Sequence, residues 1–96
     1  MGVKYGREYS DIITELVKAL GDVEGVNDFF SMDSSEWSDL EEQEKQGCIQ
    51  TLADDVIYAL GEEMAVTVGT GYVEYDDKHH VLKVFDGTKI TIINLL

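Results

Sequence analysis

Apolar side chains follow a helical spacing in the first part of this chain and a strand spacing in the last part. Over residues 10–20 they recur at i, i+3 and i+4, which places them on one face of an α-helix. Ser10 can cap the start of this helix, and Gly21 stands where the left-handed residue after a helix is expected. We therefore predict a helix over residues 10–20 whose apolar face packs against the rest of the chain.

A second helical region is predicted over residues 34–60, after a connection that mixes acidic and apolar residues. Asp33 and Glu36 have the spacing of a capping box, which marks the start of a helix. The connection, residues 21–33, has the length of an ordered loop with a helical turn rather than of a linker. Within the helical region the apolar stripe shifts by roughly 100° around the axis. Gln46-Gly47 lies at the shift, and glycine costs about 1 kcal/mol relative to alanine inside a helix, so we predict a kink or break there.

After the second helical region the apolar spacing becomes alternating, and the residues are rich in Val, Ile, Thr and Tyr. Asp86-Gly87 is a favoured pair for a two-residue hairpin loop, and residues 76–79 supply a four-residue turn before it. Gly69-Thr70-Gly71 interrupts the first strand, either as a bulge or as a further turn, and both remain open. The predicted strands are residues 64–75, 81–85 and 88–95.

These turns set the register of the strands, and the register decides which side chains share a face. With these loops, Phe85 opposes Thr88 and Tyr72 opposes Lys83. One face then carries Tyr72, Val81, Phe85, Ile90 and Ile92, joined by Met64, Val66 and Val68 if the glycines do not shift the phase. The second face carries Val73, Tyr75, Leu82, Val84, Ile93 and Leu95. Because two helices can cover only one face, we expect the other to meet a loop, a second copy of the chain or a partner. The second face is the candidate homodimer surface.

Together these elements predict one small acidic domain over residues 1–96, of the α+β class. Its two helical regions are expected to pack on one face of a three- to four-stranded antiparallel β-meander.

Charge is distributed unevenly along the chain. The net charge is −13, and residues 8–63 hold sixteen acids against Lys18 and Lys45, whereas residues 64–96 hold four acids against three lysines. Between Ala19 and Glu44 there are nine carboxylates and no Lys or Arg. A block of one sign repels itself and opposes compaction, so we expect it to serve an interaction. Its field disfavours direct binding to nucleic acid or to a membrane surface and favours basic proteins.

The sequence contains no motif that predicts catalysis, a cofactor or a metal. His79-His80 are adjacent and are expected in a turn rather than as metal ligands. No nucleophile elbow is present, and the one glycine-rich stretch precedes a strand rather than a helix. We therefore expect a non-enzymatic protein with no cofactor and no bound metal. The single Cys48 excludes an internal disulfide, and without a leader pattern or an apolar run of membrane length we expect a cytoplasmic protein.

The acidic segment is the candidate partner-binding site. From Glu36 to Glu44 five acids span eight helical steps, roughly 12 Å, or one charge about every 3 Å. That spacing is close to the roughly 3.4 Å per charge along one DNA strand. We interpret as phosphate surrogates Glu36, Asp39, Glu41, Glu42 and Glu44, flanked by Asp28 and Asp33. The candidate apolar anchors are Phe29, Phe30 and Trp37. Alternatively, the acids are a solvated face and the aromatic residues hold the loop on the core.

In size, acidity and α+β composition the chain resembles the loose group of phage-type DNA-mimic inhibitors, and also small immunity proteins. The resemblance covers the whole chain, includes no shared motif and assigns no residue. We therefore expect an acidic inhibitor that blocks a basic, nucleic-acid-handling protein. One alternative is a self-associating structural or regulatory domain that dimerises through the second sheet face. Another is an immunity protein against a basic toxin.

Overall fold

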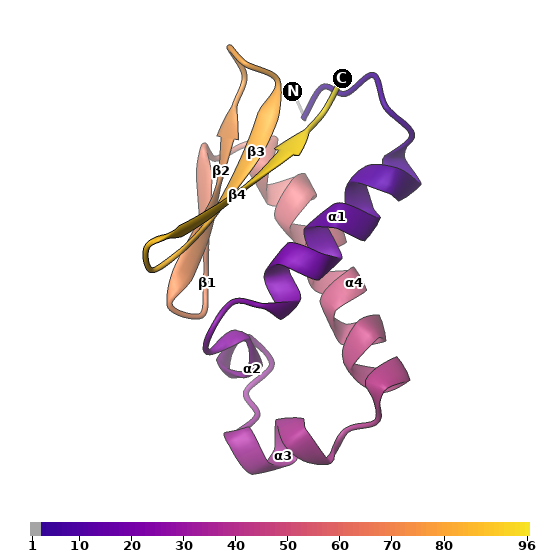
Figure 1. The fold of residues 1–96 in the computed structure, drawn as a ribbon, viewed down its shortest axis with the longest axis vertical. Helices are drawn as coiled ribbons and strands as arrows, with labels where there is room; N and C mark the ends of the chain where they lie inside the picture. Colours follow the sequence, from indigo (N-terminus) through magenta and orange to yellow (C-terminus); the bar gives the residue numbers. More distant parts are fainter. Residues whose placement is uncertain (1–2) are drawn as a thin grey trace.

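The computed structural model describes residues 3–96 as four helices followed by a four-stranded antiparallel sheet, which confirms the α+β class (Figure 1). The strands lie in the order β1-β2-β3-β4, the simple meander that the alternating spacing predicted. The helices are α1 (Tyr9–Gly21), α2 (Val26–Phe29), α3 (Ser34–Asp39) and α4 (Glu42–Leu60). The strands are β1 (Ala65–Val68), β2 (Gly71–Asp76), β3 (Val81–Asp86) and β4 (Lys89–Asn94).

The core lies between the sheet and the two long helices, α1 and α4, which pack against each other and against the same face of the sheet (Figure 1). Leu16 and Leu20 of α1, Leu52 of α4 and Leu82 of β3 are all at most 1% exposed. Burying one such side chain contributes roughly 1.5–3 kcal/mol to folding. This shared core therefore fixes the position of the helices relative to the sheet.

The first helix begins earlier than the sequence indicated. It starts at Tyr9 with Glu8 in the capping position, so Ser10 is not the cap. Ser10 instead lies in the first turn, where its carbonyl oxygen accepts a hydrogen bond from the Thr14 hydroxyl at 2.8 Å. The connection after α1 contains the predicted helical turn, which is α2.

The break in the second helical region lies at Leu40 and not at Gln46-Gly47, so the predicted position was wrong. Leu40 has extended backbone angles (φ −69°, ψ 145°), which end α3 and turn the chain before α4. The Glu44 carboxylate accepts the backbone N–H of Glu41 at 3.1 Å and so starts a new helix. Gly47 remains inside α4, because the long apolar stripe that follows it holds the helix on the core.

Gly69-Thr70-Gly71 forms a turn and not a bulge, because Val68 pairs directly with Gly71. Gly69 has φ +56°, and a Cβ atom there would lie 2.5 Å from the carbonyl oxygen of Glu24. A glycine is therefore required at this point. Thr70 holds the turn against the chain after α1, donating both its backbone N–H and its hydroxyl to the Glu24 carbonyl at 3.0 Å.

Both later hairpins are shifted by two residues from the predicted register. Phe85 pairs with Ile90 rather than with Thr88, and Tyr72 pairs with Phe85 rather than with Lys83. The loops are residues 87–88 and 77–80, each one position further along the chain than the residue types indicated. A shift of two leaves every side chain of β2, β3 and β4 on its predicted face, since successive side chains alternate.

The predicted homodimer surface is wrong, because the second sheet face is the one that the helices cover. All six of its residues lie in the core and are at most 8% exposed: Val73, Tyr75, Leu82, Val84, Ile93 and Leu95. The glycine turn does shift the phase of β1, since Val66 pairs with Val73 and thus joins this inner face together with Val68. The helices leave the outer face uncovered, where Tyr72, Ile90 and Ile92 are exposed and Phe85 is half-buried. Val81 keeps its predicted place on this face but is only 8% exposed.

Candidate functional site

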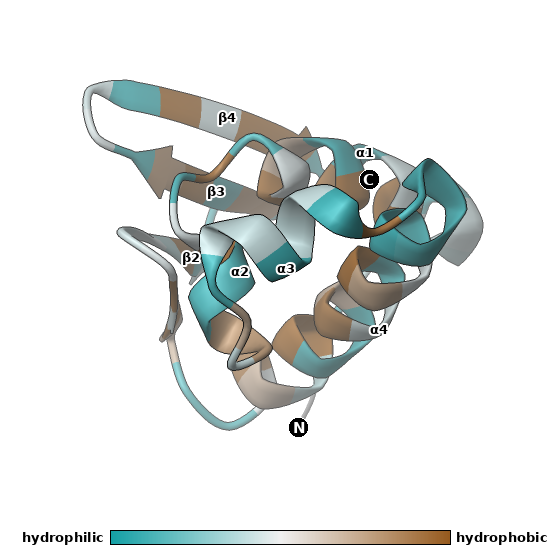
Figure 2. Ribbon diagram, turned by 90° about the horizontal axis from the view of Figure 1, so that it is seen from below, coloured by the Kyte–Doolittle hydropathy of each residue, from teal (hydrophilic) through white to brown (hydrophobic). Residues whose placement is uncertain are grey.

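The predicted acidic site residues gather at one end of the molecule. We call this the acidic end and define it as residues 26–44, which comprise α2, α3 and the start of α4. It lies opposite both chain termini in Figure 1, and Figure 2 looks at it directly, with hydrophilic stretches on α2 and α3. All seven predicted carboxylates are exposed there: Asp28, Asp33, Glu36, Asp39, Glu41, Glu42 and Glu44.

These carboxylates have no cationic partner within residues 3–96. The ion pairs of that part of the chain join Arg7 to Glu15, Lys83 and His79 to Asp76, and Lys89 to Asp22. None of the four pairs includes an acid of the acidic end. Its negative field therefore reaches solvent without neutralisation by a neighbouring side chain.

Some of these acids also organise the local helices. Asp33 Oδ1 accepts the backbone N–H of Glu36 at 2.8 Å, and Glu36 Oε1 accepts that of Asp33 at 3.3 Å, which confirms the predicted capping box. Glu44 has the corresponding role at the start of α4. By contrast, Asp28, Asp39 and Glu42 make no side-chain hydrogen bond in the described chain, so their carboxylates serve no local structure there.

The predicted straight row of five charges does not form. Glu36 and Asp39 lie on α3, whereas Glu42 and Glu44 lie on α4, and the extended backbone of Leu40 separates the two helices. The spacing of about 3 Å per charge assumed one continuous helix axis. The acids thus share one end of the molecule on two short helical segments, without the linear order of a DNA strand.

The three predicted aromatic anchors form one cluster but differ in exposure. The Phe30 ring stacks on Trp37, with ring centroids 5.6 Å apart and planes within 3°, and Phe29 meets Phe30 edge-on at 5.5 Å. Phe30 and Trp37 are half-buried and pack against the core. They therefore hold α2 and α3 on the body of the protein, whereas Phe29 is 47% exposed and free to meet a partner.

A hollow of about 730 Å³ lies beside the acidic end, between α1 and α4. Ile13 and Ile49 line it from the core side, and Trp37 of α3 lines it as well. Lys18 and Lys45 also line it, and they are the only cationic residues among residues 8–63. The scarce positive charge of the helical part is thus gathered at this hollow. Sequence reasoning missed it, because it depends on how α1 and α4 diverge.

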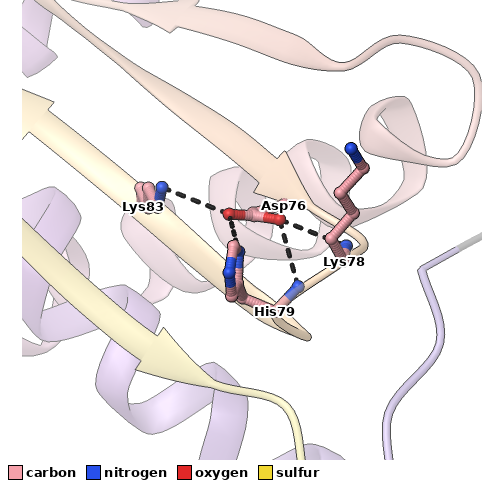
Figure 3. Close-up of polar contacts among 4 residues, drawn as sticks. All are labelled: Asp76, Lys78, His79 and Lys83. Carbon is pink, nitrogen blue, oxygen red and sulfur yellow. Dashed lines mark hydrogen bonds and ion pairs between the residues drawn. The ribbon is translucent and has the colours of Figure 1, made fainter.

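A polar cluster holds the β2–β3 turn, at the other end of the molecule (Figure 3). Asp76 accepts the backbone N–H groups of Lys78 and His79 at 3.1 Å, the His79 ring Nδ1 at 2.8 Å and Lys83 Nζ at 3.2 Å. The hydrogen bond from the His79 ring, with those from the turn and Lys83, holds the pKa of Asp76 well below its usual range. A carboxylate that stays ionised in this way stabilises the turn and is poorly suited to proton transfer.

His79 and His80 lie in this turn, as the sequence predicted. Within residues 3–96 no group of three or more His, Cys, Asp and Glu side chains is arranged to hold a metal ion.

Tyr9 is the second residue whose pKa is strongly shifted, and this shift also has a structural cause. Its hydroxyl donates a hydrogen bond to Asp54 Oδ1 at 2.8 Å and so joins α1 to α4. Burial, together with this bond and the negative charge of Asp54, raises the pKa of Tyr9 to about 12. Neither perturbed group lies in the acidic end.

Among the residues described, none of the helices has both the length and the apolar character needed to span a membrane. Comparison of the chain with protein-family models, with curated proteins and with solved structures finds no match.

Proposed function

We propose that this protein is a non-enzymatic binding protein whose acidic end docks on a basic, nucleic-acid-handling protein and blocks it. The observation that carries the proposal is the gathering of seven exposed carboxylates at the end of the molecule opposite the C-terminus, none of them in an ion pair with any of residues 3–96. A folded protein has no need of such a field for its own stability, since like charges oppose compaction. The field is useful when a cationic surface approaches.

The charges and the exposed aromatic ring have different roles in this proposal. Complementary charges chiefly accelerate and orient the encounter, and each exposed ion pair adds only about 0.2–1 kcal/mol. Much of the remaining affinity comes from an apolar side chain that is buried on binding. Phe29 fits this role, because it is half-exposed and directly follows Asp28 in the chain. Phe30 and Trp37 support it from behind by stacking.

The partner class follows from the kind of surface that complements the acidic end. Proteins that bind nucleic acid present clustered Lys and Arg to phosphate groups. An acidic protein seated on such a cluster occupies the place of the nucleic acid and releases the same counterions. This competition requires a dense negative surface of suitable size, without the regular spacing of a strand. A basic toxin meets the same requirement, and the identity of the captured partner decides between the two.

The test removes three charges from the acidic end without touching its hydrogen bonds. The variant is Asp28→Asn, Asp39→Asn and Glu42→Gln, and the matched control removes three exposed acids elsewhere through Asp55→Asn, Glu62→Gln and Glu63→Gln. Each tagged protein is used to capture partners from lysate of its source at low and at high salt, followed by mass spectrometry. We expect a basic nucleic-acid-binding protein that wild type and control retain and the acidic-end variant loses. Equal loss in both variants would mean that net charge alone attracts the partner.

A further inference from the structure

The outer face of the sheet is an apolar surface that no element of the described chain covers, since α1 and α4 lie on the inner face (Figure 1). We call its apolar residues the outer patch: Tyr72, Phe85, Ile90 and Ile92. Tyr72 is 40% exposed and the two isoleucines are 55% and 56% exposed. The Tyr72 and Phe85 rings stack on each other, with centroids 4.4 Å apart. Single exposed apolar side chains are common, but a contiguous patch on adjacent strands indicates a binding surface.

The strand register arranges this face in rows that run across the sheet. One row contains Thr67, Tyr72, Phe85 and Ile90, from β1 to β4. The next row contains Ala65, Glu74, Lys83 and Ile92. In these two rows the central residues are chemical complements: an aromatic pair in the first and an acid with a base in the second. A third row, next to the β2–β3 turn, contains Asp76, Val81 and Asn94.

We propose that the outer patch binds a second copy of this chain, through a two-fold axis that runs parallel to the strands between β2 and β3. Such an axis lays β2 of one copy over β3 of the other and keeps each residue at its own row. Tyr72 then faces Phe85 of the partner subunit, and Glu74 faces Lys83 of the partner subunit. At the margins Ile90 faces Thr67 of the partner subunit. Aromatic rings thus meet aromatic rings and opposite charges meet, as a self-complementary interface requires.

Charge selects a second copy over the other occupants of this face. Residues 64–96, which form the sheet, carry a net charge of only −1, whereas residues 8–63 carry −14. Two copies that meet through their sheets therefore keep their helical layers apart on opposite sides. A basic protein is instead attracted to the acidic end, away from this patch.

Glu74 is also available for the partner subunit. It lies directly across from Lys83 on the neighbouring strand, yet the Lys83 ammonium pairs with Asp76 at 3.2 Å. Within residues 3–96 Glu74 forms no ion pair. Its carboxylate is thus left to pair with Lys83 of the partner subunit, whose ammonium has three donor hydrogens and can hold this carboxylate beside that of its own Asp76.

The size of the face predicts a dimer of low affinity. Strands β2, β3 and β4 have six residues each and β1 has four. With strands about 4.8 Å apart and about 3.3 Å per residue, the face measures at most roughly 19 by 20 Å. Two such faces packed about 10 Å apart bury roughly 760 Å² in total, which is smaller than a stable specific interface and fits a weak, transient contact. We therefore expect monomer and dimer to exchange with protein concentration.

Sedimentation velocity over a concentration series of the whole chain tests the proposal. We expect a dimer for the wild type that Ile92→Lys weakens by at least about tenfold in dissociation constant, because the lysine buries a charge in the contact. Ile92 is more than half exposed, so the substitution leaves the monomer folded. The matched control is Tyr58→Lys on α4, where the side chain is 80% exposed and far from the outer patch, and it should leave the dimer intact. A wild type that is monomeric at millimolar concentration overturns the proposal, as does a dimer that Ile92→Lys leaves unchanged.

A charge exchange tests the two-fold arrangement itself. Glu74→Lys places lysine opposite Lys83 of the partner subunit, and Lys83→Glu places two glutamates opposite each other, so each variant alone should be monomeric. An equimolar mixture restores both opposite-charge contacts and should form a heterodimer. Circular dichroism confirms that each variant is folded before mixing. A mixture that stays monomeric, or single variants that dimerise like the wild type, contradicts this geometry.

Discussion

The acidic end and the outer patch are the two surfaces of this protein that differ most from ordinary protein surface, and they differ from each other in how they are built. The acidic end consists of short helical segments held by capping boxes and by one aromatic stack. The outer patch lies on β2 and β3, which are hydrogen-bonded on both sides, and on the edge strand β4, and the core supports all three from behind. The first surface is rich in charge and locally ordered, and the second is nearly neutral and rigid.

The difference in construction bears on the partner that we propose for each surface. Charge acts over a distance and orients an encounter, while apolar area acts only on contact. We therefore propose a partner of opposite sign for the acidic end and a second copy of the chain for the outer patch. Because the two lie on different elements, each can be altered without the other.

The largest loss of stability is expected from a substitution in the core that supports both surfaces. Leu52→Ala removes a side chain that is 1% exposed, between α4 and the sheet. We expect the free energy of unfolding to fall by about 2–5 kcal/mol, measured by urea denaturation. Tyr58→Ala, on the exposed side of the same helix, is the control and should change it by less than about 0.5 kcal/mol. If Leu52→Ala has as little effect as Tyr58→Ala, the two surfaces do not share this core.

A smaller and local effect is expected when the cap of α3 is removed. Asp33→Ala deletes the acceptor of the Glu36 backbone N–H and should cost about 0.5–2 kcal/mol in α3. Hydrogen exchange of single amides should show faster exchange in α3 and unchanged exchange in β2 and β3. Equal acceleration in the sheet would mean that the acidic end is not a separate local unit.

At the opposite end of the molecule, Asp76 should contribute to stability in a way that depends on pH. Its pKa is lowered from an ordinary value of 3.8 by the His79 and Lys83 contacts, so the folded state favours the ionised carboxylate. The contribution is present above pH 3.8 and is lost as the pH falls further, because the unfolded chain takes up the proton first. The free energies of unfolding of wild type and Asp76→Asn are measured between about pH 6 and pH 2. The difference between them should shrink as the pH falls. A stability difference that does not depend on pH would contradict the stabilising role of the Asp76 contacts in this turn.

The smallest effect concerns the link between α1 and α4. Tyr9→Phe removes the hydrogen bond to Asp54 and should cost about 0.5–1.5 kcal/mol. The pKa of Tyr9 is raised from 10.0 to about 12, so its contribution is complete below pH 10 and is lost as the pH rises through 12. Ultraviolet titration of the wild type should show a phenol that ionises near pH 12 and that Tyr9→Phe lacks. If Tyr9→Phe has the same titration curve as the wild type, the phenol that ionises near pH 12 belongs to another tyrosine.

The change from helical to alternating spacing was enough to predict the α+β class, because each apolar pattern can bury its side chains in only one kind of element. The predictions that were wrong include the position of the helix break and the choice of the covered sheet face. The sequence predicts a kink or break at Gln46-Gly47, because glycine weakens helices. Instead Leu40 ends α3, and the hydrogen bond from the Glu41 N–H to Glu44 starts α4 before that point. The inner and outer faces of the sheet were interchanged because sequence does not state which face the helices choose.

For the candidate site, the sequence identified the acids and the aromatic residues but not their arrangement. Exposure of the seven carboxylates follows from the cost of burying charge. Their distribution over two helices, the stacking of Phe30 on Trp37 and the hollow near Lys18 all depend on long-range packing. The periodicity of apolar residues describes one element at a time. It carries no information on how separate helices and side chains lie relative to one another.

The central claim is that the acidic end is a docking surface, and the salt dependence of binding tests it most directly. The dissociation constant of the captured partner is measured over a range of salt concentrations for wild type, for the variant Asp28→Asn, Asp39→Asn, Glu42→Gln, and for the control Asp55→Asn, Glu62→Gln, Glu63→Gln. We predict that the acidic-end variant binds more weakly with a shallower salt slope, while the control keeps the affinity and slope of the wild type. An acidic-end variant with unchanged affinity and slope would contradict the account.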